Sequence, residues 1–206
     1  MTHRYRSLLF TAEVRDAQER QGSPAALGIV PPEEAGEEPD RLGPDEAAFI
    51  GARDSFYMAT VGSRGWPYLQ HRGGPSGFVR VMGPDRLAFA DLRGNRQYIS
   101  LGNVAGEGRA ALFFMDYARR ARLKLLGRVE AVPLGDAPEA VEALGDPRLR
   151  ARVERVLVVT VEAFDWNCPQ YIVPRWTAEE IAPAVERLQE RIAELEAEVA
   201  RLRGEG

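Results

Sequence analysis

The apolar positions of the chain's central part fall in short runs separated by turn residues. Segments rich in β-branched and aromatic residues occupy 55–61, 67–72, 77–82, 86–90, 109–115, 122–132 and 155–164, and the last, with its run from Val156 to Val161, carries the strongest strand signal. The glycine-containing turns at 62–65 and 83–85 predict hairpins. Tight turns between short strands, with one helix at about 95–105, predict a mainly β fold built on an antiparallel barrel.

Helical patterns flank this central block. Residues 11–20 predict a short amphipathic helix capped by Thr11, and a second helix is expected from Asp45, as its cap, to Ile50. Residues 22–44 are rich in Pro, Gly and Glu, which is typical of an extended linker or arm, and 138–151 has a weaker helical pattern. We therefore expect an N-terminal helical arm over 1–44 and a barrel domain over 45–176.

The hydrophobic period changes at residue 177, and a long C-terminal helix is expected over 177–206. The apolar residues Ile181, Val185, Leu188, Ile192, Leu195, Val199 and Leu202 alternate steps of four and three. β-Branched residues at the a positions with leucine at d favour a parallel two-stranded coiled coil. The alternative is that the helix buries this stripe against its own barrel. The sequence leaves both arrangements open.

Composition excludes several classes of protein. The 206 residues carry a net charge of −4, which gives no overall attraction to nucleic acid or to an anionic membrane. The single cysteine, Cys168, cannot form an internal disulfide, and no Cys/His cluster has the spacing of a metal site. No apolar run approaches the roughly 18 residues that span a bilayer, and the apolar patch at 8–10 is too short for a signal peptide. We expect a cytoplasmic protein.

An anion site is predicted where two strands end. Arg72 ends one strand beside a glycine-rich bend, and the strand over 86–90 runs into a predicted helix whose first turn carries Asn95, Arg96 and Gln97. Free backbone N–H groups and added guanidinium groups at a helix start favour a phosphate. All basic residues but Lys124 are arginine, so a solvated helix-start arginine is the alternative for Arg96.

These residues carry a family resemblance. Arg72, the glycine bend, Phe89-Ala90-Asp91 and Gly94-Asn95-Arg96-Gln97 resemble the pyridoxamine 5'-phosphate oxidase-like FMN-binding split barrels over about residues 45–175. The chain is more similar to the uncharacterised branch of that superfamily than to the vitamin B6 enzyme. The resemblance implies a six-stranded antiparallel Greek-key split barrel, a homodimer, and FMN in the groove between subunits.

The resemblance also implies roles for individual residues at the phosphate. Arg72 and Arg96 would grip phosphate oxygens, with Asn95 and Gln97 donating beside them. Familiar members of the family carry serine, arginine and lysine at that helix start, so this chain lacks one of the family's positive charges. Weaker phosphate binding is therefore expected here.

Further residues are implied at the flavin ring. Ala90 and Asp91 end a strand where the family contacts the ring; the alternative for Asp91 is a helix cap or a turn former. Arg122 replaces a glutamine that contacts the flavin, or else lies on a solvated strand face in a cation row with Arg120 and Lys124. Asn167 and Arg175 would reach the flavin of the opposing subunit; the alternative is that this aromatic-rich tail closes the barrel.

The expected function is that of an FMN-binding oxidoreductase. With His3 and His71 as the only histidines, no Ser/His/Asp catalytic arrangement is credible, so no catalytic side chain is assigned and the flavin would carry the chemistry. The partner would be a small-molecule substrate or electron donor such as NAD(P)H. Two alternatives stay open: a non-catalytic flavin carrier or sensor, and a split barrel that binds haem or a deazaflavin.

Overall fold

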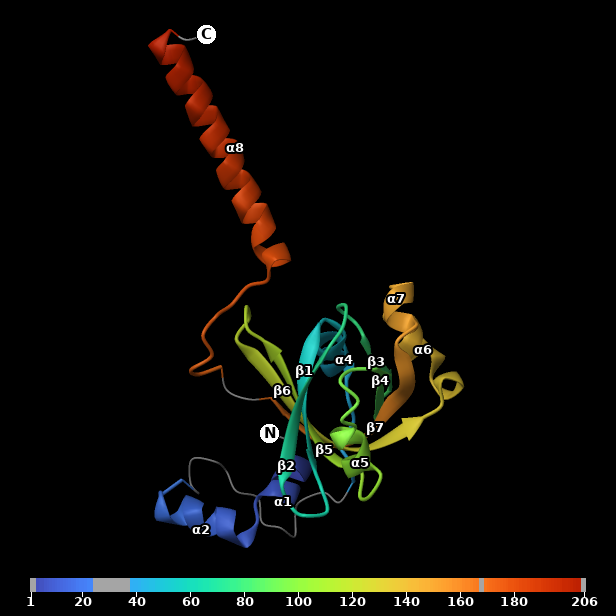
Figure 1. Cartoon of the computed structure of the whole chain (residues 1–206). Coiled ribbons are helices and arrows are strands. Elements are labelled where there is room, and N and C mark those ends of the chain that lie inside the picture. The colour runs from blue at the N-terminus through green and yellow to red at the C-terminus, as the bar shows by residue number, and fades with distance from the viewer. Residues whose placement is uncertain (1–2, 24–37, 167–168, 205–206) are drawn as a thin grey trace. The chain divides into compact units, whose positions relative to one another are not determined.

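The chain forms two compact units in a computed structural model that describes residues 3–23, 38–166 and 169–204 (Figure 1). The first unit comprises Met1–Asp116 and Ala121–Pro169, and the second comprises Tyr117–Arg120 and Gln170–Gly206. Most of the predicted linker, and Asn167 in the tail, lie outside the described residues.

The described part of the first unit is built on a seven-stranded antiparallel sheet in the order β2-β1-β5-β6-β7-β4-β3. Its strands are β1 (Ser55–Val61), β2 (Pro67–Gly73), β3 (Val79–Gly83), β4 (Arg86–Leu92), β5 (Arg109–Asp116), β6 (Ala121–Val132) and β7 (Val153–Trp166). Each corresponds to one of the segments predicted from the apolar pattern. The mainly β split-barrel fold is confirmed, with seven strands where the resemblance implied six.

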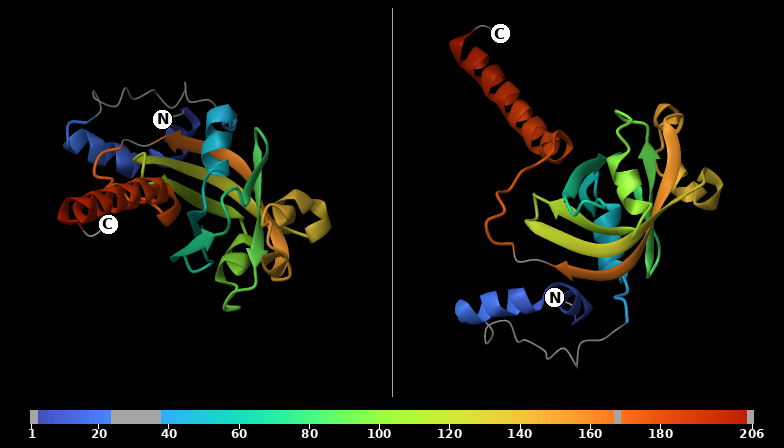
Figure 2. Two further views of the ribbon diagram at one scale, coloured as in Figure 1. Left: turned by 90° about the horizontal axis from the view of Figure 1, so that it is seen from above. Right: turned by 60° about the horizontal axis from the view of Figure 1, so that its bottom comes forward.

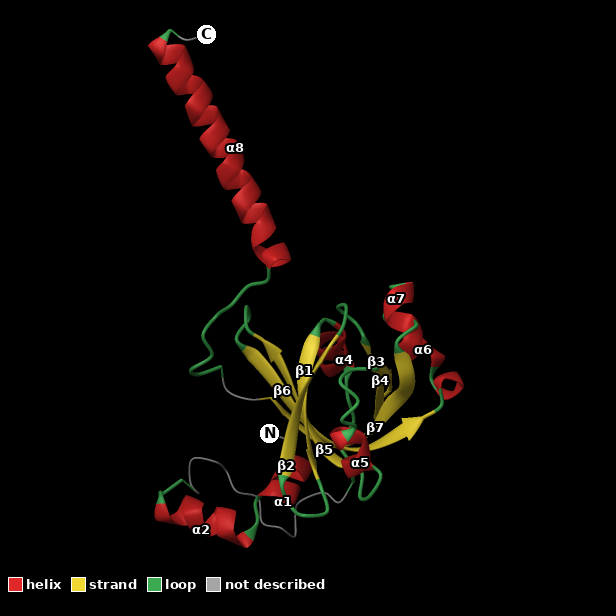
Figure 3. Cartoon of the chain, in the orientation of Figure 1, coloured by secondary structure: helices red, strands yellow, loops and turns green. Residues whose placement is uncertain are grey.

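The sheet curls on itself (Figure 3), and large apolar side chains form the core of the first unit. The ring of Phe56 on β1 lies 5.0 Å from that of Phe89 on β4, although three strands separate β1 from β4 in the sheet order. Phe56 also stacks on Phe114 of β5 at 4.9 Å. All three rings are buried, so apolar burial holds the two ends of the sheet toward each other.

A β-bulge marks the pairing of β6 with β7 at Leu126 and Gly127. A Cβ on Gly127 would lie 2.6 Å from both the Thr160 carbonyl oxygen and a Val159 methyl group. Since real side chains do not approach backbone so closely, glycine is required at this close crossing of the two longest strands.

Short helices cover the outer side of β4 and β7 (Figure 2). The η2 turn (Leu134–Asp136) comes first, and α6 (Pro138–Glu142) and α7 (Pro147–Arg150) replace the single helix predicted over 138–151. Ala137 and Ala140 pack there on Ala88 and Val156 as a second small core. Gly145, at φ 67°, ends the α6 turn, and Asp146 caps α7, so turn chemistry divides the predicted helix.

The N-terminal helices are α1 (His3–Leu9), α2 (Ala12–Arg20) and α4 (Pro44–Gly51). The Thr11 side chain accepts a hydrogen bond from the Val14 N–H, which confirms the predicted cap of α2. The predicted cap of α4 at Asp45 is wrong. Gly43 caps this helix, its N–H donating to Glu46 Oε2 at 2.9 Å, because Pro44 is favoured at the first helical position.

The helix predicted to begin at Asn95 begins later, as α5 (Ile99–Val104). The Asn95 side-chain oxygen accepts from the Gln97 N–H at 3.2 Å, an Asx-type turn that competes with helical hydrogen bonding. Arg96 and Tyr98 then take left-handed conformations, at φ 60° and 51°. Asn95, Arg96 and Gln97 thus form a turn before the helix, and the predicted contribution of a helix N-terminus at these residues is wrong.

The second unit is dominated by α8 (Ala178–Arg203), which begins at a Thr177–Glu180 capping box and ends at Gly204, at φ 71°. Arg175 lies over the Tyr117 ring at 5.0 Å. None of the helices in the described ranges is both long and apolar enough to span a bilayer.

Candidate functional site

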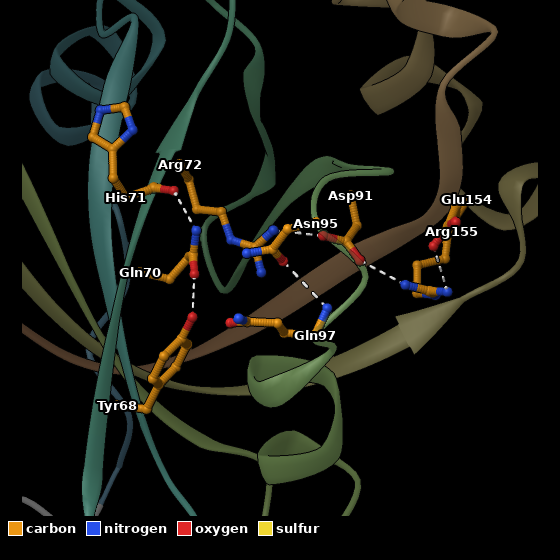
Figure 4. Close-up of polar contacts among 9 residues, drawn as sticks. All are labelled: Tyr68, Gln70, His71, Arg72, Asp91, Asn95, Gln97, Glu154 and Arg155. Carbon is orange, nitrogen blue, oxygen red and sulfur yellow. Dashed lines mark hydrogen bonds and ion pairs between the residues drawn. The ribbon is translucent and has the colours of Figure 1, made fainter.

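A cleft of about 300 Å³ opens on the first unit between β2, the end of β4 and the segment 94–101. One wall carries Tyr68, Gln70 and Arg72, and the facing side carries Asn95, Arg96 and Gln97. Figure 4 shows the side chains of Arg72, Asn95 and Gln97 gathered in this space beside Asp91. Strand β2, at one edge of the sheet, is thus brought opposite β4, near the other edge.

Asp91 holds two arginines at the edge of the cleft. Its Oδ1 accepts from Arg72 at 2.5 Å and its Oδ2 from Arg155 at 2.7 Å, and the residue is only 7% exposed. Asp91 and Arg155 are paired residues of β4 and β7, so strand register brings this carboxylate and guanidinium together. Charge-assisted hydrogen bonds of this kind fix orientation as well as charge.

A second carboxylate continues the network. Glu154 accepts from Arg155 at 3.0 Å and from the Tyr98 hydroxyl at 3.1 Å, while Arg155 lies over the Tyr98 ring at 5.3 Å. Burial opposes charge on Arg155, but the hydrogen bond and attraction of Asp91, with Glu154 adding to them, prevail and raise the pKa of Arg155. The stabilisation from charged Arg155 is complete below its pKa in the unfolded chain and is lost as the pH rises through its pKa in the folded chain. Both pKa values lie far above neutral pH, so Arg155 stays charged there.

Three hydrogen-bond donors of the cleft are left without an acceptor in the described part of the chain. The Nε atom of Arg72 is buried and has no partner there. The Arg96 guanidinium is exposed, and neither it nor the Gln97 side-chain amide contacts an acceptor within the described ranges. A buried N–H without a partner costs free energy, so the arrangement suits a ligand that brings acceptor oxygens.

Six of the nine predicted binding residues line the cleft: Arg72, Ala90, Asp91, Asn95, Arg96 and Gln97. Sequence reasoning missed Arg155, Glu154 and Tyr98. Arg155 opens the strand predicted over 155–164, and its position opposite Asp91 depends on register, which an apolar pattern does not specify.

The other three residues are placed elsewhere or not described. Arg122 lies on β6 and does not line the cleft; its buried Nε has no partner in the described ranges. Arg175 belongs to the second unit, against Tyr117, and Asn167 lies outside the described residues.

The cation row predicted on β6 does not form as expected. Arg120 lies in the turn before the strand, at φ 55°. Lys124 pairs with the buried Asp165 at 2.8 Å and lies over the Tyr5 ring at 4.9 Å. Because Arg120 lies in a turn and Lys124 is ion-paired, the three cations do not form a row on one strand face. Arg122 has no ion pair within the described ranges.

Trp166, in the aromatic tail, packs on α4. Its ring meets Phe49 edge-on at 4.7 Å, and its Nε1–H donates to Glu46 at 2.6 Å. Both contacts fix the end of β7, which supports the barrel-closing interpretation for this residue.

Comparison with known proteins identifies a family. Residues 42–166, more than half of the chain, match the family described as "Pyridoxamine 5'-phosphate oxidase". No curated protein matches. The solved structures similar to this chain include HupZ of Group A Streptococcus, at 17% identity over 66% of this chain and 99% of that one, with a TM-score of 0.49.

Two further similar structures have lower TM-scores. A putative pyridoxamine 5'-phosphate oxidase of Lactobacillus delbrueckii has 18% identity over 61% of this chain and 93% of that one, with a TM-score of 0.45. An FMN-binding protein of Syntrophomonas wolfei has 12% identity over 59% and 83%, with a TM-score of 0.47. On the match over residues 42–166, the chain belongs to the pyridoxamine 5'-phosphate oxidase family.

Proposed function

We propose that this protein binds FMN in the cleft, with the phosphate on Arg72, Arg96 and Gln97, and acts as an FMN-dependent oxidoreductase on a small substrate. The observation that carries the proposal is the buried Nε of Arg72, which has no acceptor among the described residues and lines the same cleft as Arg96. A phosphate oxygen would satisfy this donor.

The charge of the cleft fits an anion of modest affinity. The cleft lining carries the guanidinium groups of Arg72 and Arg96 and the carboxylate of Asp91. Arg155 and Glu154 pair with each other behind Asp91 and add no net charge. The excess is one positive charge, so the protein would hold a doubly negative ester by hydrogen bonds as much as by Coulomb attraction. This agrees with the presence of Gln97 where familiar members of the family carry a lysine.

The ring end of the ligand would lie toward Ala90, where strand β4 reaches the cleft. Bound flavin would supply the two-electron chemistry, and the chain's own residues would bind and orient it. We assign Asn167 and Arg175 to contacts with the flavin of the opposing subunit in a homodimer, and Arg122 to a contact with the ribityl or N1/O2 region of the flavin. An electron donor such as NAD(P)H would approach the open face of the ring.

The outer face of the β1–β2 hairpin supports a homodimer. Tyr57, Val61 and Leu69 point away from the core and are 37%, 54% and 63% exposed. Trp66 at the hairpin turn is 80% exposed. Contiguous apolar side chains on one sheet face are typical of a protein interface, and they adjoin β2, which forms one wall of the cleft.

The test is the visible spectrum and the mass of the small molecule released from freshly purified protein. The proposal predicts a flavin spectrum and the mass of FMN. It also predicts that NAD(P)H or another reductant bleaches the flavin under anaerobic conditions, and that repeated turnover follows when an electron acceptor is added. Bound FMN without turnover would indicate the carrier or sensor. A Soret band would identify haem as the ligand in place of FMN, and the mass of a deazaflavin would identify that cofactor instead.

A further inference from the structure

We propose that two copies of this chain pair through α8 as a parallel, in-register, two-stranded coiled coil. The inference is independent of the ligand in the cleft. The seven apolar residues of the stripe, from Ile181 to Leu202, are 42–72% exposed. A stripe of this length left in water would cost hydrophobic free energy that pairing recovers.

The stripe favours a second copy of this chain as its occupant. Val185, Ile192 and Val199 occupy the a positions, and Leu188, Leu195 and Leu202 occupy d. β-Branched side chains at a with leucine at d pack well in parallel dimers and less well in trimers or tetramers. Pro183, within the helix, falls at an outward f position, so it does not interrupt the seam.

Charges beside the seam favour the parallel orientation. The heptad places Arg191 at g opposite Glu196 at e of the second copy, and Glu198 at g opposite Arg203 at e. By symmetry each attraction occurs twice. An antiparallel pair that sets Ile192 against Leu195 would retain only the Arg191–Glu198 attraction.

Competing contacts within one helix are weak. Arg191 pairs with Glu194 at 2.7 Å and Arg201 with Glu198 at 3.8 Å, both three residues apart and solvent-exposed. Exposed pairs of this kind contribute only a few tenths of a kcal/mol. They do not prevent Arg191 and Glu198 from turning to a neighbouring helix.

Disulfide trapping in the full chain tests the proposal. In a Cys168→Ser background, Val185→Cys places a thiol at the seam, and Glu190→Cys places one at the outward f position as a matched control. In a parallel pair, Val185 meets its own counterpart, so Val185→Cys should form a linked dimer in a glutathione buffer at least about tenfold more than Glu190→Cys does.

Three results would contradict a parallel two-stranded coiled coil. Equal linking of the two variants would overturn the pairing. Linking of Val185→Cys chains to Leu202→Cys chains in preference to themselves would show an antiparallel pair. A sedimentation mass of three or four chains for the unsubstituted protein would contradict two strands.

Charge reversal supplies a second variant set that leaves the apolar seam intact. Arg191→Glu should lower the equilibrium linking of Val185→Cys on the order of tenfold, because two attractions become repulsions. Adding Glu196→Arg in the same chain should restore it. Failure of the second change to restore linking would contradict the assigned register.

Discussion

Arg72 and Asp91 form a hydrogen-bonded ion pair between β2 and β4, strands that lie near opposite ends of the sheet order. Strands β1, β5, β6 and β7 separate β2 from β4 in the sheet order, so only the curl of the sheet brings Arg72 and Asp91 together. The contact therefore closes one side of the barrel and holds Arg72 at the cleft. The Arg72–Asp91 pair therefore contributes both to the stability of the barrel and to the ligand-binding site.

Asp91→Asn should lower stability and strengthen anion binding at once. The substitution keeps the shape of the side chain but leaves Arg72 and Arg155 without their shared carboxylate. We expect the free energy of unfolding to fall by about 1–3 kcal/mol, and FMN affinity to rise because the cleft gains a positive charge. Denaturant unfolding and FMN titration measure the two effects.

The matched control is Asp85→Asn, at the exposed β3–β4 turn, which should change neither quantity. Weaker FMN binding by Asp91→Asn would mean that the carboxylate is needed chiefly to position Arg72. Unchanged stability would contradict the closing role of the pair.

Arg96 is expected to bind ligand from a strained backbone. At φ 60°, Arg96→Gly relieves the left-handed conformation whereas Arg96→Ala keeps it, so the glycine variant should be more stable by about 1 kcal/mol. Both should lose FMN affinity roughly tenfold or more, as expected for one charge-assisted hydrogen bond. Thermal unfolding and fluorescence titration separate these effects.

Arg93→Ala is the control for Arg96, because Arg93 is exposed on the same segment and does not line the cleft. Equal loss of affinity in Arg93→Ala would point to general surface charge. The double variant Arg72→Ala with Arg96→Ala should abolish FMN retention, and a double variant that keeps its flavin would refute the phosphate assignment.

Gly127→Ala should destabilise the barrel by about 1–3 kcal/mol, since the new methyl group meets backbone at the β6–β7 bulge. Gly102→Ala in α5 is the comparison, because open space surrounds that glycine. It should be neutral or stabilising by up to about 1 kcal/mol. Equal unfolding midpoints for both variants would contradict the close crossing.

Truncation after Thr177 should lower the stability of the dimer while leaving the flavin spectrum of the barrel unchanged. The physical reason is that α8 adds a second contact between copies whose effective concentration the barrels set. The unfolding midpoint at low protein concentration is the measurement. An unchanged midpoint would speak against pairing through α8.

The fold could be predicted from sequence because alternation, β-branched runs and glycine turns act locally. The strands over 55–61 and 155–164 depend on nothing more distant than their own pattern. The start of α5 could not, since the Asn95 side chain and the left-handed Arg96 and Tyr98 outcompete a helical turn.

The site was predicted only where the family motif reaches. Arg72 and Arg96 line one cleft as expected, whereas Arg155 reaches Asp91 at its edge through the register of β7 against β4. Register is a property of the paired strands, so no single segment reveals it. The bond from Arg72 to Asp91 depends instead on the curl of the sheet, because β2 and β4 are not neighbours in the sheet order.

The most direct test of the phosphate site compares FMN with riboflavin, which has the same ring and no phosphate, by fluorescence titration of the unliganded protein. We predict that FMN binds roughly tenfold more tightly than riboflavin, or better, and that this affinity ratio falls toward one in Arg96→Gly but not in Arg93→Gly. Equal affinity of the unsubstituted protein for the two flavins would contradict the phosphate site.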